Sequence, residues 1–414
     1  MSARPTISVA LITRNEEDTL ARALASVQDI ASETVVVDTG STDGTVEIAK
    51  RYGATIGHFA WCDDFAAARN AALDLCTGDW VLSLDADEEL DAKTGHNLRR
   101  LVALKTAGLA TFGLQIRTLN DREGVRQWGT FYATRLFPRH PTLRWRKTIH
   151  EQIEHVDDEA LLTRILTSDV VIVHYGYLRE EFAAKAKDER NLRILSHAIA
   201  DAPDDGTLWH DLTRQHYAAG RSREAIEAAV RCIELARAQG KQNMTWAAYA
   251  YMMLVGSYLL TDQYDAGIAV GREALEWHRE YSSLWANLGL CHQSKGEYAD
   301  ALTCFQNALT LAKMGMAYEA DESVATWRTW WNIGNTYKAM GELVRAVECY
   351  WEAMDAEREI AAPRLAAAVC LSTLGEIAMA RELAEGVLTR WPGQAEAEGI
   401  IMRLEHKEAV DAHR

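Results

Sequence analysis

The second half of the chain repeats a fixed spacing of apolar and small residues. The copies are Trp209, Leu212, Gly220 and Ala225; Trp285, Leu288, Gly296 and Ala301; and Trp330, Ile333, Gly341 and Ala346. Tyr251 begins a further copy 34 residues before Trp285, and a last one runs through Gly375 to Pro392. A period of this length is typical of helix pairs whose apolar face is covered only by the next pair. The pattern therefore predicts a solenoid of stacked helices.

The spacing resembles the tetratricopeptide repeat, most closely in "LWANLGLCHQSKGEYADALTCFQNALTL" (284–311). Five copies are predicted in residues 206–394, starting near 206, 248, 282, 327 and 361. A linking helix is predicted at 179–205 and a capping helix at 395–414. We expect the Trp and Tyr residues to be packing residues. The concave face remains able to bind a peptide or another subunit, and a homo-oligomer is one alternative.

The first half alternates apolar runs with helical patterns. The runs "ISVALIT" (7–13), "TVVVD" (34–38) and "DWVLSLD" (79–85) are separated by helix-like stretches. Such alternation indicates βαβ units and an α/β domain with a mixed, mostly parallel sheet, here assigned to residues 1–178. In open sheets of this kind ligands bind at the carboxyl ends of the strands.

Acidic residues crowd the end of one of these runs, in "LSLDADEE" (82–89). Like charges this close destabilise a strand end unless a positive charge lies among them. Asp85 and Asp87 offer hard oxygen ligands that suit Mg²⁺ or Mn²⁺. A solvated acidic turn is the alternative interpretation of these residues alone.

Composition excludes several classes of protein. The chain has 414 residues and a net charge of −16, which argues against a broad nucleic-acid footprint. Its seven cysteines show neither zinc-binding nor disulfide spacing. No apolar stretch is long enough for a membrane span, and the N-terminus does not resemble a signal peptide, so we expect a cytoplasmic protein.

Four motifs in order, "ISVALITRNEE", "VVVDTGSTDGT", "FAAARNAAL" and "GDWVLSLDADE", resemble the family-2 glycosyltransferases of the GT-A fold. The resemblance implies a nucleotide-sugar donor, here a UDP-sugar, and Mn²⁺ or Mg²⁺ bound by Asp85 and Asp87. The donor-binding candidates are Thr13, Asn15, Glu16, Asp38, Arg69, Asp85 and Ala86. One departure is that Thr39 follows Asp38 where many relatives carry a second acid.

The resemblance also implies a general base and a further metal ligand later in the chain. "RWRKTIHEQI" (144–153) supplies Glu151, which would remove the acceptor proton and give inversion in one step. "VVIVHYGY" (171–178) supplies His174, which would complete the metal shell. His150 competes for the metal or diphosphate. Trp128, Trp145 and Tyr175 are weaker candidates for a wall on which the sugar stacks.

The motif order followed by repeats resembles the branch that contains bacterial protein and peptide glycosyltransferases, a likeness that is associational. It implies a hexosyltransferase that moves a sugar from a UDP-sugar to a protein or peptide side chain. The repeats are then candidates for the part of the chain that holds the acceptor. The alternatives are transfer to a polysaccharide, a lipid-linked glycan or a small metabolite. A tetratricopeptide scaffold with an inactive sugar domain is a third option. Nucleic acid is disfavoured as a partner by charge.

Overall fold

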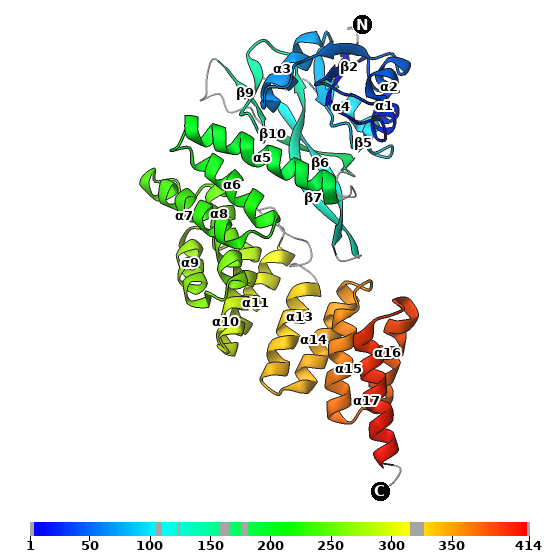
Figure 1. Ribbon diagram of the computed structural model, residues 1–414, viewed down its shortest axis with the longest axis vertical. Helices are drawn as coiled ribbons and strands as arrows, with labels where there is room; N and C mark the ends of the chain where they lie inside the picture. Colours follow the sequence, from blue (N-terminus) through cyan, green and yellow to red (C-terminus); the bar gives the residue numbers. More distant parts are fainter. Residues whose placement is uncertain are drawn as a thin grey trace. The chain divides into compact units, whose positions relative to one another are not determined.

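The computed structural model describes residues 4–104, 110–122, 125–156, 165–174, 181–314 and 327–411. Within these ranges the structure describes the backbone alone at 119–122, 125–129, 165, 181–186, 313, 410 and 411. The chain divides into two compact units, residues 1–203 and 204–414. Figure 1 shows strands and helices in the first unit and helices alone in the second.

The first unit is built on a sheet in the order β3-β2-β1-β4-β7-β6-β10-β5. Its first half comprises β1 (Ile7–Thr13), β2 (Glu33–Asp38), β3 (Thr55–His58) and β4 (Trp80–Ser83), all parallel. The predicted parallel βαβ arrangement is therefore confirmed in this part. Strands β1, β2 and β4 end at the same edge of the sheet, because neighbours are paired in parallel register.

The second half of the sheet is mixed. It comprises β5 (Glu88–Leu90), β6 (Thr111–Arg122), β7 (Val125–Pro138) and β10 (Ile165–His174). Strand β7 is antiparallel to both β4 and β6, whereas β10 is parallel to β6 and antiparallel to β5. Strands β10 and β4 consequently point the same way. His174 at the end of β10 therefore lies at the same edge as the residues that follow β4.

Helices cover both faces of the sheet because strand side chains alternate between them. Helices α1 (Leu20–Val27), α2 (Thr45–Arg51) and α4 (Leu98–Ala103), the last preceded by the 3₁₀ turn η1 (Gly95–Asn97), pack with Val9 and Leu11. Helix α3 (Phe65–Leu75) and the hairpin of β8 (Leu143–Arg146) and β9 (Gln152–His155) pack against Ala10 on the other face. Figure 1 shows α3 apart from α1, α2 and α4. Helix α5 (Glu181–Asp201) completes this unit.

The second unit is a series of antiparallel helix pairs. They are α6 (Gly206–Ala218) and α7 (Ser222–Ala238), α8 (Thr245–Leu260) and α9 (Tyr264–Trp277), α10 (Ser282–Ser294) and α11 (Tyr298–Lys313), α13 (Trp327–Ala339) and α14 (Leu343–Ala356), α15 (Ala362–Leu374) and α16 (Ile377–Arg390), and α17 (Ala395–Asp411). The described residues of this unit thus form five helix pairs and one terminal helix. No helix in the described parts of the chain is both long and apolar enough to cross a membrane.

Glycines let large aromatic side chains approach the neighbouring helix within a pair. A Cβ on Gly334 of α13 would lie 2.5 Å from Tyr350 of α14, and one on Gly289 would lie 2.7 Å from Phe305. Tyr350 and Phe305 are both fully buried. This supports the expectation that repeat aromatics are packing residues, although Trp277 and Trp351 are exposed.

Replacing Gly334 with Ala should destabilise the repeat unit by about 1–3 kcal/mol, because the added methyl group overlaps the buried ring of Tyr350. The matched control is Gly386→Ala in α16, where a Cβ would meet no atom within 4 Å. That change should stabilise the unit by about 0.5–1 kcal/mol through helix propensity. Urea unfolding followed by circular dichroism measures both, and equal shifts would contradict the close approach.

Candidate active site

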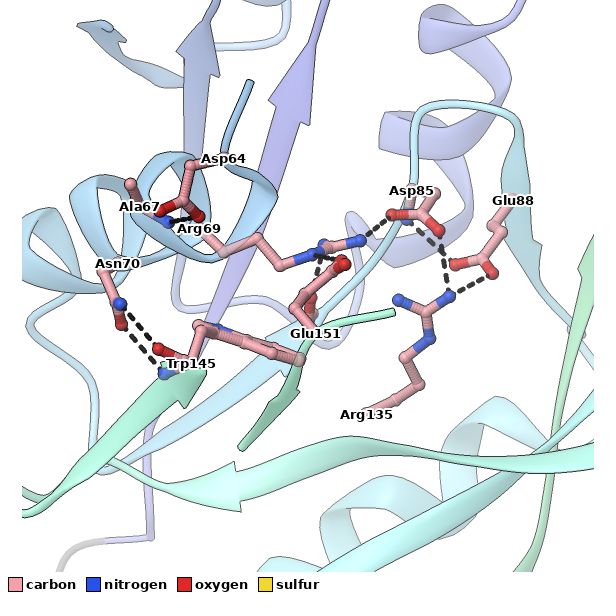
Figure 2. A network of polar contacts seen from close by, with 10 residues as sticks. Asp64, Ala67, Arg69, Asn70, Asp85, Glu88, Arg135, Trp145 and Glu151 are labelled. Carbon is pink, nitrogen blue, oxygen red and sulfur yellow. Dashed lines mark hydrogen bonds and ion pairs between the residues drawn. The ribbon is translucent and has the colours of Figure 1, made fainter. Parts of the chain in front are cut away.

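Arg69 is a buried charged residue of the first unit. It lies on α3, is 8% exposed, and its guanidinium contacts three side chains (Figure 2). Nε donates to Glu151 at 2.5 Å, Nη1 to Ser83 at 3.0 Å and Nη2 to Asp85 at 2.7 Å. Burial opposes the charge, but Asp85 and Glu151 outweigh burial and raise the pKa of Arg69. The residue is therefore a permanent cation between two carboxylates.

Local structure fixes the direction from which Arg69 approaches. Asp64 caps the N-terminus of α3 by accepting a hydrogen bond from the Ala67 amide at 2.8 Å, as an N-cap residue does. The side chain of Asn70 exchanges two hydrogen bonds with the backbone of Trp145 on β8, at 2.9 and 3.0 Å. The Trp145 ring lies under the guanidinium of Arg69, 5.2 Å from its central carbon. Helix α3 and the β8–β9 hairpin are thus fastened together beside the site (Figure 2).

A second arginine, the largely buried Arg135 on β7, contacts the acidic turn after β4. Its Nη2 donates to Asp85 at 2.9 Å and to Glu88 at 2.6 Å, while Glu88 accepts from the Asp85 amide at 2.9 Å. Arg135 and Arg69 outweigh the effect of burial and hold the pKa of Asp85 below its usual range. Burial raises the pKa of Glu88, against the lowering effect of Arg135. Asp85, Glu88 and Arg135 therefore each contact the other two.

Sequence reasoning missed Arg135 and Glu88. The available signal was the arginine inside the apolar run "FYATRLF" (131–137), because a charge on a buried strand needs a partner. Register explains the partner: Leu136 pairs with Leu82, so Arg135 lies toward the carboxyl end of β4. Two arginines of the chain itself, Arg69 and Arg135, supply the positive charge beside these acidic residues.

Asp87 turns toward a different group. Its Oδ2 lies 3.4 Å from Nε2 of His174, which ends β10. Although burial opposes both charges, each partner favours the charged form of the other, which lowers the pKa of Asp87 and raises that of His174. Thr118 Oγ1 lies 3.4 Å from the other ring nitrogen of His174.

These two side chains fit a divalent cation. A carboxylate oxygen and an imidazole nitrogen facing one point are ligands that Mn²⁺ accepts, and oxygens of a donor phosphate and of water suit the remaining positions. Asp85 is less available as a metal ligand, because each of its carboxylate oxygens already accepts a hydrogen bond from an arginine. Its role as a metal ligand stays a prediction, as does that of His174.

The candidates for the nucleoside lie in the loops after β1 and β2. Asp38 accepts hydrogen bonds from the amides of Gly40 and Ser41, both at 3.1 Å. Asn15, with φ of 55°, accepts from the Thr42 amide at 2.8 Å, so the two loops interlock. The Oγ1 of Thr13 is buried and has no hydrogen-bond partner in the described part of the chain.

The remaining candidate residues are partly or fully buried, or lie outside the described residues. Glu16 accepts a hydrogen bond from the Thr19 hydroxyl at 2.8 Å. Ala86 is 4% exposed and Trp145 is 6% exposed, so the ring of Trp145 supports Arg69 and leaves little surface for a sugar. His150 has a positive φ of 53° directly before Glu151. Tyr175 and the side chain of Trp128 lie outside the described residues.

The chain matches two families of sequence. Residues 8–168 match the family described as Glycosyl transferase family 2, and residues 282–313 and 328–359 each match the tetratricopeptide repeat. A TPR repeat-containing protein of Synechococcus elongatus is 31% identical over 326 residues, which cover 75% of this chain and 77% of that protein.

Two other relatives carry the name glycosyltransferase. An uncharacterized glycosyltransferase of Rickettsia typhi is 42% identical over 97 residues, 23% of this chain and 33% of that protein. The SPbeta prophage-derived glycosyltransferase SunS of Bacillus subtilis is 24% identical over 230 residues, 55% of this chain and 53% of that protein. The chain thus spans about a third of the rickettsial protein and half of SunS.

Solved structures resemble the chain weakly. PilW, a type IV pilus biogenesis factor, has a TM-score of 0.44 and 13% identity over 53% of this chain and 94% of that chain. The APC/C hetero-tetramer Cut9-Hcn1 has a TM-score of 0.44 and 18% identity over 54% of this chain and 40% of that chain. The repeat assignment rests instead on the family matches and the order of helices.

A mixed sheet with an acidic turn at the carboxyl edge of its parallel half, followed by helical repeats, fits a glycosyltransferase domain joined to a tetratricopeptide domain. Residues 8–168 form a domain of glycosyltransferase family 2, and the chain belongs with the TPR repeat-containing proteins represented by the Synechococcus relative. The fold class and enzyme class predicted from the sequence are confirmed.

Replacing Arg135 with Met should destabilise the first unit by about 3–5 kcal/mol, because Glu88 is left as an uncompensated buried charge. The double variant Arg135→Met/Glu88→Gln removes both charges and should recover part of this loss. Urea unfolding of the two variants measures the difference. A double variant no more stable than the single one would show that the pair is not the source of the cost.

Proposed function

We propose that the chain is an inverting, divalent-metal-dependent glycosyltransferase that moves a sugar from a UDP-sugar to a side chain of a protein or peptide. One observation carries the proposal. The guanidinium of Arg69 binds both Glu151 and Asp85, so the predicted general base and the predicted donor-binding turn share one buried cation. Residues far apart in the sequence are thereby held as one site.

Glu151 has the geometry of a general base. Oε1 accepts from Arg69, and no hydrogen bond within the described residues engages Oε2. Glu151 is only partly exposed, its side chain at 12%, which limits competition from water. An acceptor group brought to Oε2 would lose its proton to Glu151 while its heteroatom forms a bond to the anomeric carbon of the sugar. The bond from that carbon to the diphosphate oxygen breaks on the opposite side, which inverts the configuration.

The negative charge left on the nucleoside diphosphate needs stabilisation by fixed positive groups. Asp87 and His174 would hold a divalent cation, which when bound supplies Lewis-acid stabilisation of that charge. Arg69 and Arg135 each donate a hydrogen bond to Asp85, which lies two residues before Asp87. The buried hydroxyl of Thr13 and the interlocked loops at Asn15 and Asp38 lie at the same edge, where the nucleoside is expected.

The proposed acceptor follows from the second unit. Stacked tetratricopeptide pairs present an extended surface, which suits a peptide better than a small metabolite. The motif order shared with bacterial protein and peptide glycosyltransferases supports the same choice. The likeness to SunS supports transfer of a sugar, since that relative is named as a glycosyltransferase.

Replacing Glu151 with Gln should slow sugar transfer by about 10²–10⁴-fold, the usual contribution of a general base, while UDP-sugar binding stays within about threefold of wild type. Glutamine keeps the shape and can still accept from Arg69. Glu154→Gln on β9, three residues away, is the matched control and should transfer normally. Single-turnover rates and calorimetric binding separate the two effects; an unchanged rate in E151Q would move the base elsewhere.

Replacing Asp87 with Asn should abolish the part of UDP binding that depends on Mn²⁺, because it removes a charged ligand. A thermal-shift titration of UDP with and without Mn²⁺ measures this, since ligand binding raises the unfolding temperature. Asp18→Asn, an exposed residue of the same charge, is the control. A Mn²⁺-dependent shift that persists in D87N would contradict metal binding at Asp87.

A further inference from the structure

Glu151 lies at the end of a short loop whose backbone is unusual. The loop, residues 147–151, joins β8 to β9. Lys147 has a φ of 69° and His150 a φ of 53°. A positive φ is uncommon for residues other than glycine, although asparagine, aspartate and histidine adopt it more readily than the rest. Because His150 directly precedes Glu151, its backbone conformation helps to set the direction of the proposed base.

Contacts on both sides of this position fix the loop. The carbonyl of Thr148 accepts a hydrogen bond at 2.9 Å from the amide of Phe65, the first residue of α3. Ile149 is 3% exposed, so its side chain is buried. Beyond the left-handed residue, Glu151 accepts a hydrogen bond from Nε of Arg69. A strained backbone persists where its surroundings determine it in this way, because relaxing it would displace one of these contacts.

The start of α3, which holds the loop, is itself braced. Asp63 precedes the N-cap residue of α3 and has a φ of 59°. It accepts a hydrogen bond from Nε1 of Trp61 and two from Arg193 of α5, all at 2.8 Å. The guanidinium carbon of Arg190, also on α5, lies 5.0 Å from the ring centre of Phe65. These contacts help to fix the amide of Phe65 that binds the loop.

We propose that His150 is a positioning residue, whose left-handed backbone conformation fixes the carboxylate of Glu151 against Arg69 and leaves Oε2 for the acceptor proton. The inference rests on the proposed function, because it takes Glu151 as the general base. It gives the imidazole of His150 no chemical step, although the sequence made that ring a candidate ligand for the metal or the diphosphate. A base held in this way needs no rearrangement when the acceptor arrives.

The test replaces His150 in the full chain with Gly, Asn or Val. All three variants lack the imidazole, but glycine and asparagine adopt a positive φ readily, whereas β-branched valine does not. The readout is hydrolysis of UDP-glucose and of UDP-N-acetylglucosamine with Mn²⁺. Water then takes the place of the acceptor: its oxygen bonds to the anomeric carbon, its proton passes to Glu151, and UDP leaves.

Hydrolysis by H150G and H150N should stay within about threefold of wild type, because the loop keeps its conformation. H150V should be slower by about 10²-fold, the cost of displacing a catalytic group by about 1 Å. The matched control is Gln152→Val, an exposed position on the extended strand β9 that also neighbours Glu151, and it should hydrolyse normally. Equal losses in H150G and H150V would show that the imidazole itself is needed and would overturn the inference.

A double variant tests whether His150 acts through Glu151. Once the base is removed, its position no longer matters, so E151Q and E151Q/H150V should hydrolyse at rates within about threefold of each other. A further loss of about tenfold or more in the double variant would mean that His150 acts by another route, contrary to the inference.

An unfolding experiment decides the same point without a substrate. H150V should lower the urea midpoint of the wild-type chain, and should lower that of Glu151→Ala by about half as much or less, because the loop can relax once the carboxylate is gone. Equal lowering in both backgrounds would refute the link between His150 and Glu151. If the wild-type chain hydrolyses neither nucleotide sugar, the proposed donor is contradicted, while the unfolding result still decides the inference.

Discussion

The geometry of the first unit depends on the buried guanidinium of Arg69. A charge at 8% exposure is costly unless every donor finds an acceptor, and Arg69 meets that demand with a hydroxyl and two carboxylates. Its partners come from the end of β4 and from the segment before β9. Because these partners offset the buried charge, the burial of Arg69 favours the positions of Glu151 and Asp85 beside it. The carboxylate of Glu151 is consequently held in place before any substrate arrives.

The sequence was sufficient to predict the features that are local. The run 7–13 is β1, the helix after Asp64 is α3, and the five helix pairs begin close to the predicted residues. Each of these follows from periodicity or capping within a short stretch. The motif order also predicted Arg69, Asp85, Asp87, Glu151 and His174 as site residues, and the structure brings their side chains to one edge of the sheet.

The contacts that the sequence did not predict are those set by strand order. Strand β7 is inserted between β4 and β6, so Arg135 reaches Asp85 and Glu88 although about fifty residues separate them. No rule of sequence spacing links an arginine in one apolar run to an acidic turn that follows a different apolar run. The same is true of α5, which periodicity identified only as a linking helix. Its contacts with Asp63 and Phe65 depend on the path of the chain in space.

The balance of charge in the site argues for positive groups beyond the two buried arginines. Three carboxylates, those of Asp85, Glu88 and Glu151, contact Arg69 and Arg135, and each arginine already binds two of them, while Asp87 contacts His174. A diphosphate entering this site would add further negative charge, which Arg69 and Arg135 are not free to neutralise. The cation proposed at Asp87 and His174 would supply part of this compensation.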